Sequence, residues 1–487
     1  MSSQGSVFCI SFDSVPVSGI VEECVKLAAV FKRRGLEIDL DLGYDILWDS
    51  EFFGRPRKAR DQLPGWVNPV RVGTPRGYSK EFVKRVLEEL VRSGGDFPAL
   101  HQSVREMALQ LSESFIELWK RRNVRYVIVE NGSVPDNLVY THALRRAIVL
   151  YGQARGLERF VIWRDHDLTW IYQLGRYGDY PYSAVPRPLG SPYVVHVVTN
   201  RIVQQWFEQW GRHPVEVLPS YQEFLHRRTH APLNRPLRRH YGIPVDACLI
   251  ARCSRIVPQK RIDREIETIA ALRRIAEAKG SKKEFYLFIT GLKSENAKEV
   301  SNLQSLARER GLENRIIWGN GLASFRKHGT DARASSKSRF SVRDLLFEAD
   351  ISSFLTSYAS EGYGLPPSEA IATGIPFTSS TYEVYDGVYG TNRYKAPLYE
   401  ITAADDSVPG PEYHNKLFNF LLDPGQQREY ADANFRRGRK EFSLEVMDDR
   451  VMELLPSLRR LPCLGDGALT EKETTRSRWT RLLRSHL

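Results

Sequence analysis

Apolar stretches and amphipathic patterns alternate along the chain, which predicts buried strands separated by helices. Near the N-terminus, residues 7–12 are apolar, residues 20–34 have the spacing of an amphipathic helix, and residues 36–42 are apolar again. A strand, a helix and a strand in this order are typical of a parallel α/β sheet. The same pattern predicts further strands at 124–129, 160–163 and 194–199 and a helix over 100–121.

The alternation resumes after a basic connector over residues 220–245, which predicts a second parallel sheet. Its strands are expected at 249–253, 285–290, 315–318, 351–355 and 375–378, and late helices over 426–442 and 444–458. The 487 residues exceed the size of one ordinary domain. Two α/β domains are therefore expected.

Residues 357–374 read S-Y-A-S-E-G-Y-G-L-P-P-S-E-A-I-A-T-G, which predicts a strand end, a glycine loop and a helix start. Pro366 or Pro367 suits the first helical position, and Gly374 suits the helix end. Amides at a helix start carry partial positive charge and can hold a diphosphate or sugar hydroxyls. Glu361 and Glu369 frame this loop and offer carboxylates to two parts of a ligand.

A cationic loop follows the expected strand at 249–253. It reads S-R-I-V-P-Q-K and contains Arg255 and Lys260. Fixed cations lower the barrier to a reaction when they face the position where a leaving group gathers negative charge. A departing nucleoside diphosphate is such a leaving group, so the two motifs complement each other.

The string EGYGLPPSEAIATGIP resembles the paired-glutamate motif of retaining glycosyltransferases with the GT-B fold, in particular the large GT4 family. The cationic loop resembles the family's G-R-x-x-x-x-K sequence, with Ser254 in place of the usual glycine. This resemblance covers residues 5–458, more loosely in the first half. It implies an α/β GT-B architecture, in which two doubly wound Rossmann-like domains face a cleft.

The resemblance also implies roles for individual residues. Glu361 would lie by the donor sugar, Glu369 would bind the nucleotide ribose, and Arg255 with Lys260 would bind the diphosphate. The remaining donor-binding positions are Gly19, Gly291, Gly362, Tyr363, Gly364 and Leu365. Gly19 stands alone where a dinucleotide fingerprint needs three spaced glycines, so a dinucleotide site is not predicted. Two interpretations of Gly19 stay open: it approaches the donor phosphates, or it only permits a tight turn.

Polar residues follow two expected strands of the first half, where ligands of doubly wound sheets bind. The acceptor-site candidates are Glu130, Asn131, Arg164, Asp165, His166 and Asp167. The D-H-D string resembles the histidine-aspartate loop of GT4 members, which implies that His166 contacts the reacting sugar. Asp165 and Asp167 also allow a competing interpretation as the metal-binding DxD of single-domain GT-A enzymes.

The resemblance implies four segments. These are an acceptor-binding domain at 1–218, a donor-binding domain at 219–443, a helix at 444–461 that crosses back to the first domain, and a basic tail at 462–487. The long polar segments at 49–95 and 324–339 have no readable role, although the second has the length of a mobile cover for the donor.

Composition and charge limit the classes of ligand and the cellular location that are expected. A net charge of +11 favours anionic ligands, while no nucleic-acid-binding motif accompanies it. Five scattered cysteines show no disulfide or zinc pattern. The chain has neither an 18-residue apolar run nor a secretory leader, so a cytoplasmic protein is expected. Near the C-terminus, Trp479, Leu482 and Leu483 could share a helix face opposite Arg478, Arg481 and Arg484, which allows peripheral contact with the inner membrane face.

The motifs and the resemblance together imply a metal-independent, retaining glycosyltransferase without a cofactor. It would move a hexose from GDP-mannose or UDP-glucose to a hydroxyl of a small, anionic sugar or sugar acid. Three alternatives stay open. They are a membrane-surface transferase with a lipid-linked acceptor, a noncatalytic protein that binds sugar nucleotides, and a phosphorylase-like enzyme that requires pyridoxal phosphate.

Overall fold

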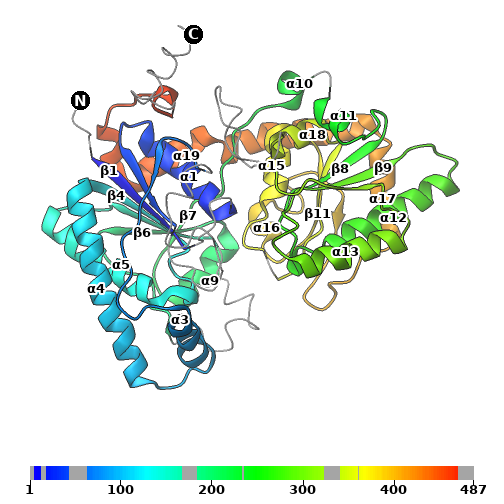
Figure 1. Cartoon of the computed structure of the whole chain (residues 1–487). Helices are drawn as coiled ribbons and strands as arrows, with labels where there is room; N and C mark the ends of the chain where they lie inside the picture. The colour runs from blue at the N-terminus through cyan, green and yellow to red at the C-terminus, as the bar shows by residue number, and fades with distance from the viewer. Residues whose placement is uncertain are drawn as a thin grey trace, which may run out of the picture.

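The computed structural model describes residues 5–12, 18–42, 63–166, 184–232, 235–322, 340–359 and 361–469. Two parallel sheets form two α/β domains that lie side by side (Figure 1). The segment 324–339, most of the basic tail and Asp167 lie outside the described residues.

The first sheet has seven parallel strands in the order β3-β2-β1-β4-β5-β6-β7. They are β1 (Ser6–Ser11), β2 (Glu37–Asp41), β3 (Val67–Pro69), β4 (Val124–Glu130), β5 (Val161–Asp165), β6 (Val194–Val198) and β7 (Glu216–Val217). Every residue of β1, β5 and β6 is buried, as expected for strands covered on both faces.

Helices cover both faces of this sheet because the crossovers on either side of β1 run in opposite directions. The helices are α1 (Gly19–Lys32), α3 (Lys80–Val86), the π-helix η2 (Leu87–Arg92), α4 (Pro98–Arg122), the 3-10 helix η3 (Pro135–Asn137), α5 (Leu138–Arg155) and α9 (Arg201–Gly211). Ser18 caps α1 by accepting a hydrogen bond from the Val21 amide, and Gly156 ends α5 in a left-handed conformation.

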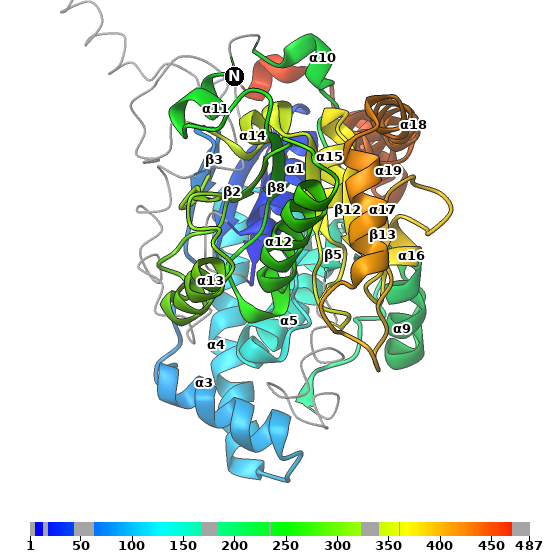
Figure 2. The ribbon, with the colours of Figure 1, turned by 90° about the vertical axis from the view of Figure 1, so that its right-hand side faces the viewer.

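The second sheet has six parallel strands in the order β10-β9-β8-β11-β12-β13. They are β8 (Cys248–Arg252), β9 (Phe285–Ile289), β10 (Ile316–Trp318), β11 (Ile351–Phe354), β12 (Phe377–Ser380) and β13 (Leu398–Tyr399). Its helices are α10 (Arg227–His230), α11 (Pro236–His240), η4 (Pro258–Lys260), α12 (Ile262–Ala278), α13 (Ala297–Glu309), α14 (Val342–Glu348), α15 (Leu365–Thr373), α16 (Tyr385–Val388), α17 (Pro411–Leu421) and α18 (Pro424–Phe442). Figure 2 shows α12 and α17 in front of this sheet.

The chain returns to the first domain after α18. Helix α19 (Leu444–Leu454) packs on α1 and is followed by the 3-10 helices η5 (Pro456–Arg460) and η6 (Asp466–Leu469). Arg33 forms an ion pair with Asp448, and the Tyr126 hydroxyl lies 3.0 Å from the Ser457 hydroxyl. The return therefore joins α19 and η5 to the end of α1 and to β4 of the first domain.

The chain crosses between the domains twice, and the two crossings touch. The amide of Gln222, on the outward crossing, donates to the carbonyl of Phe442 at 2.9 Å. Gln222 also forms an isolated parallel bridge with Ser443 on the return crossing. The two connecting segments thus run as a short pair between the sheets.

Several element boundaries differ from the sequence-based predictions. Strand β5 continues through Arg164 and Asp165, and β4 continues through Glu130, because these polar residues find partners inside the fold. The expected helix over 444–458 ends at Leu454 and is followed by a 3-10 turn. Residues 63–95, which had no readable role, contain β3, α3 and η2.

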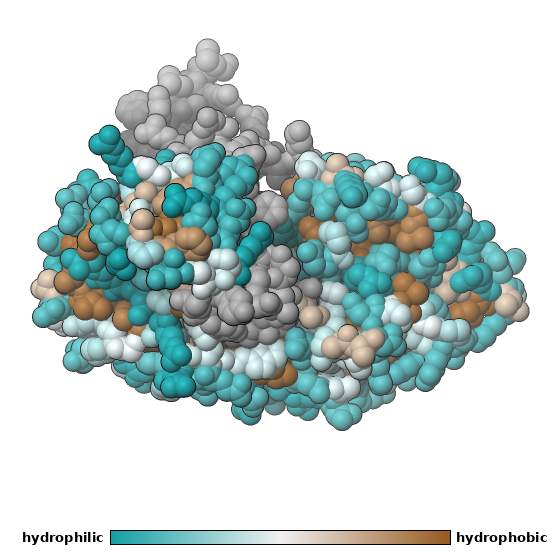
Figure 3. Space-filling model, turned by 90° about the horizontal axis from the view of Figure 1, so that it is seen from below, coloured by the Kyte–Doolittle hydropathy of each residue, from teal (hydrophilic) through white to brown (hydrophobic). Residues whose placement is uncertain are grey.

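The face in Figure 3 carries mainly hydrophilic residues, and its hydrophobic residues occur in small groups over both domains. Among the described helices, none combines the length and the apolar character needed to cross a bilayer.

The buried leucine directly after α19 gives a test of the fold. Leu455 is completely buried in a core that it shares with the first domain. Leu455→Ala should lower the free energy of unfolding by about 3 kcal/mol, because it leaves a cavity between elements far apart in the sequence. Urea denaturation followed by circular dichroism measures this change. Leu422→Ala, at a leucine that is 45% exposed, is the control and should change it by less than about 0.5 kcal/mol.

Candidate functional site

Each sheet has one point where its strand order reverses. In the first sheet β1 lies between β2 and β4, and in the second β8 lies between β9 and β11. Ligands of doubly wound sheets bind beyond the carboxyl ends of the strands at such points. The loops after β4, β8 and β11 carry Asn131, Arg255 with Lys260, and Glu361 to Gly364, respectively.

Lys260 and Glu361 meet at the switch point of the second sheet. Lys260 ends η4 in the loop after β8, and Glu361 follows β11. Their side chains form an ion pair, and the Thr356 hydroxyl donates to Glu361 Oε1 at 3.0 Å. Glu361 is buried, so the lysine compensates a carboxylate that would otherwise be costly to bury.

Arg255 and Gly291 lie on neighbouring loops of the same domain. A Cβ atom on Gly291 would lie 2.7 Å from the carbonyl oxygen of Ser254, so glycine is required for this close approach. The Arg255 side chain is about half exposed and forms an ion pair with Glu295. Arg255 therefore lies at the edge of the site, whereas Lys260 lies inside it.

The glycine loop between β11 and α15 is held from the first domain. Asn200 Nδ2 donates to the carbonyl of Gly362 at 2.9 Å, and the Thr199 hydroxyl donates to the same oxygen at 3.2 Å. Leu365, rather than a proline, is the first helical residue, and Gly374 ends the helix as expected. Asn200 also caps α9, so one side chain connects that helix to the loop.

Two side chains from the glycine loop and the start of α15 contact the domain junction. The Tyr363 hydroxyl donates to the carbonyl of Ser220 at 3.1 Å, so its buried ring turns toward the outward crossing. A Cβ on Gly19 would lie 3.3 Å from Leu365 Cδ1. The structure thus brings the first residue of α1 against the first residue of α15.

Glu369 lies on α15 and is partly buried near charges from α1. Burial above all, and then the charge of Glu22, raises the pKa of Glu369 to about 8, against the opposing effect of Lys26. Lys26 Nζ lies 2.7 Å from Glu23 Oε1 and donates to Gln222 Oε1 at 3.2 Å. Glu369 therefore holds its proton at neutral pH when no ligand is bound.

The first-domain candidates form a buried charge network. His166 Nε2 lies 2.6 Å from Glu130 Oε2, and Arg164 Nε donates to the same oxygen at 2.9 Å. Arg164 is completely buried, and its Nη1 lies 3.7 Å from Glu23 Oε2 on α1. The Glu130 carboxylate can only accept a hydrogen bond, so His166 must carry a hydrogen on Nε2 to donate to it.

Asn131 and Asp165 shape the loop after β4. Asn131 has a φ of 56°, and its side-chain oxygen accepts from the His166 amide at 2.8 Å. Asp165 accepts from the amide and the hydroxyl of Ser133, at 3.1 and 3.0 Å. Burial raises the pKa of Asp165 to about 7 even though these hydrogen bonds favour the carboxylate. Both oxygens of Asp165 are therefore engaged within the protein.

Sequence reasoning missed several residues that support the site. Each of them acts through a side-chain contact that no local sequence pattern shows. They are Glu23, Lys26, Thr199, Asn200, Thr356, Tyr382 and Tyr389. For the two tyrosines, the sequence does contain a signal, because four tyrosines occur within residues 382–394. Among the described residues, no cluster of histidine, cysteine and carboxylate groups has the arrangement of a metal site.

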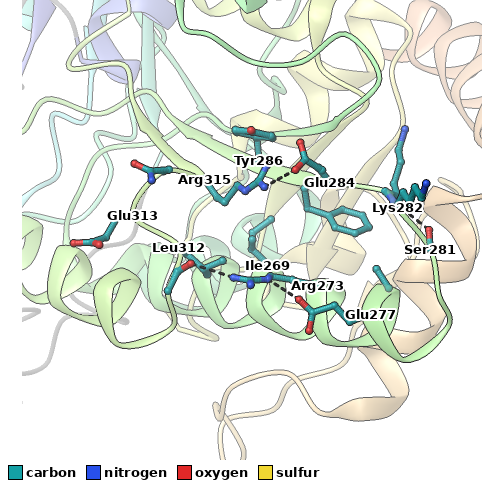
Figure 4. A pocket seen from close by; sticks show the side chains of 15 residues that line it. Ile269, Arg273, Glu277, Ser281, Lys282, Glu284, Tyr286, Leu312, Glu313 and Arg315 are labelled. Carbon is teal, nitrogen blue, oxygen red and sulfur yellow. Dashed lines mark hydrogen bonds and ion pairs between the residues drawn. The ribbon is translucent and has the colours of Figure 1, made fainter.

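A separate pocket of about 550 Å³ lies at the amino ends of β9 and β10, the edge of the sheet opposite the site (Figure 4). Arg273 pairs with Glu277 there, and Arg315 pairs with Glu284. The two arginines at this pocket thus have anionic partners already.

The whole chain resembles solved structures of glycosyltransferases. A glycosyltransferase from Rickettsia africae is 12% identical, with a TM-score of 0.58 over 94% of this chain and 100% of that one. Sucrose-phosphate synthase from Thermosynechococcus elongatus is 13% identical, with a TM-score of 0.59 over 94% and 99%. Anabaena HepE in complex with UDP is 14% identical, with a TM-score of 0.57 over 93% and 100%.

No protein-family model matches the chain, and no curated protein sequence matches it. The similarity to the solved structures shows the fold, which is the GT-B arrangement of two Rossmann-like α/β domains. The predicted fold class is thereby confirmed.

The protonated state of Glu369 gives a pH prediction. The folded protein keeps this proton up to about pH 8, whereas the usual pKa is 4.5. The folded state then binds more protons than the unfolded state, so stability falls as pH rises between these values. The difference in thermal midpoint between wild type and Glu369→Gln should change across pH 5–8 and level off above pH 8. Glu117→Gln, at an exposed glutamate, should follow wild type. A pH-independent difference between wild type and Glu369→Gln would contradict the raised pKa.

Proposed function

We propose that this protein is a retaining, metal-independent glycosyltransferase of the GT4 type, which moves a hexose from a nucleotide sugar to an acceptor hydroxyl. The observation that carries the proposal is the ion pair between Lys260 and Glu361 at the switch point of the second sheet. It lies beside a glycine loop that leads into a helix, the arrangement that suits a sugar and a diphosphate.

Donor binding would use both ends of this loop. Lys260 and Arg255 supply positive charge for the diphosphate, and the amides at the start of α15 add partial positive charge. Glu369, the fifth residue of α15, would form hydrogen bonds with the ribose hydroxyls. Lys260 would exchange part of its contact with Glu361 for the phosphate, which frees Glu361 to bind the sugar.

Lys260 and Arg255 would stabilise the transition state. The bond between the sugar C1 and the diphosphate oxygen breaks, and that oxygen gains negative charge that a fixed cation stabilises. The acceptor oxygen then bonds to C1 on the same face, and its proton passes to the departing phosphate. His166, oriented by Glu130, would bind the reacting sugar from the first domain.

The solved structures and the net charge suggest which substrates to test first. Solved HepE complexes contain UDP and UDP-glucose, which favours a uridine nucleotide over GDP-mannose as the first donor to test. The net charge of +11 favours an anionic acceptor such as a sugar acid. Asp165 uses both oxygens for Ser133, which supports donor binding without a metal ion. We propose a cytoplasmic location.

The first test is thermal stabilisation by UDP, GDP, ADP and their sugars in the presence of EDTA. A clear shift with one nucleotide family would support metal-free donor binding and name the base. No shift with any nucleotide would contradict the proposed function.

Lys260→Ala tests the proposed chemistry. Transfer or hydrolysis of the sugar nucleotide should fall at least about a hundredfold, because the cation that stabilises the leaving group is lost. Circular dichroism should show that the variant is folded. Lys298→Ala removes an exposed lysine of α13 and should keep wild-type turnover. Wild-type turnover in Lys260→Ala would rule out this role.

A further inference from the structure

A cluster of four buried tyrosines lies behind the glycine loop. Tyr382, Tyr385, Tyr389 and Tyr394 follow β12, and each is at most 1% exposed. Adjacent rings pack 5.5–6.0 Å apart, from Tyr382 through Tyr385 and Tyr389 to Tyr394. Tyr363, from the glycine loop itself, packs 6.0 Å from Tyr389. The glycine loop therefore packs against a buried cluster of aromatic rings.

Two of these tyrosines bond to the backbone of the loop. The Tyr382 hydroxyl donates to the carbonyl of Tyr363 at 2.6 Å, and the Tyr389 hydroxyl donates to the carbonyl of Gly364. The buried hydroxyl of Tyr385, between them in sequence, has no hydrogen-bond partner among the described residues. Chemically identical side chains in one cluster thus differ in whether they hold the loop.

Holding a carbonyl also fixes the direction of the next amide. In a trans peptide the N–H of the following residue points away from the C=O. The carbonyls of Tyr363 and Gly364 point toward the second domain, where Tyr382 and Tyr389 bind them. The amides of Gly364 and Leu365 must then point away from the tyrosines, and neither of them donates to a described residue.

Gly364 lies in close contact with Tyr382 and has a backbone conformation that favours glycine. Its φ is +80°, and a Cβ atom there would lie 2.2 Å from the Tyr382 hydroxyl oxygen. Position 364 therefore requires glycine for two reasons: the backbone conformation, and the close approach of the Tyr382 hydroxyl.

We infer that Tyr382 and Tyr389 are positioning residues, which aim the amides of the glycine loop at the donor sugar and diphosphate. This inference rests on the proposed function, because that function supplies the ligand. The direction of the loop amides can be tested in the protein without a ligand. Loss of either hydroxyl would leave a buried carbonyl unpaired and let its peptide rotate, so the amide would lose its direction.

The experiment compares Tyr382→Phe, Tyr389→Phe and Tyr385→Phe. The first two should bind UDP-glucose, or the sugar nucleotide that stabilises wild type, about tenfold more weakly by calorimetry. Tyr385→Phe should bind like wild type, because its hydroxyl has no partner to lose. Wild-type affinity in the first two variants, or equal weakening in all three, would overturn the inference.

Crystal structures of the three free variants provide a readout that needs no ligand. The peptide planes after Tyr363 in Tyr382→Phe and after Gly364 in Tyr389→Phe should rotate, while Tyr385→Phe keeps both planes. An unchanged loop in all three would overturn the positioning role even if wild type binds no nucleotide. Failure of wild type to bind any sugar nucleotide would instead contradict the proposed function.

Discussion

The ion pair between Lys260 and Glu361 is the interaction on which the candidate site depends. A buried carboxylate needs a partner, and here the partner comes from a loop a hundred residues away in the chain. The pair joins the loops that follow two neighbouring strands, so the glycine loop and the cationic loop keep a fixed relation. Thr356 adds a hydrogen bond to the same oxygen, which fixes the carboxylate further.

The first domain repeats this use of buried charge. Glu130 serves both His166 and Arg164, and Arg164 reaches toward Glu23 on the helix that faces α15. Burial opposes ionisation of Glu23, but Lys26 and Arg164 outweigh it and lower its pKa. Charged groups thus extend without interruption from the loops of the first sheet to the domain junction.

The sequence predicted the parts of the molecule that depend on local patterns. Two parallel sheets could be read from apolar runs, and the helix cap at Gly374 from its residue type. The ends of β4 and β5 could not, because Glu130 and Arg164 are charged and become acceptable inside only by pairing with each other. Asn200, Tyr382 and Tyr389 were missed for a related reason, since each acts on the backbone of a loop distant in sequence.

The paired crossings at Gln222 and Ser443 have a mechanical consequence. Both crossings pass through the contact between Gln222 and Ser443, so a rotation of one domain about this contact would stretch neither segment. A movement that separated the two crossings would break the bridge between them. The contact between the crossings is therefore the place where a hinge between the two domains would cost least.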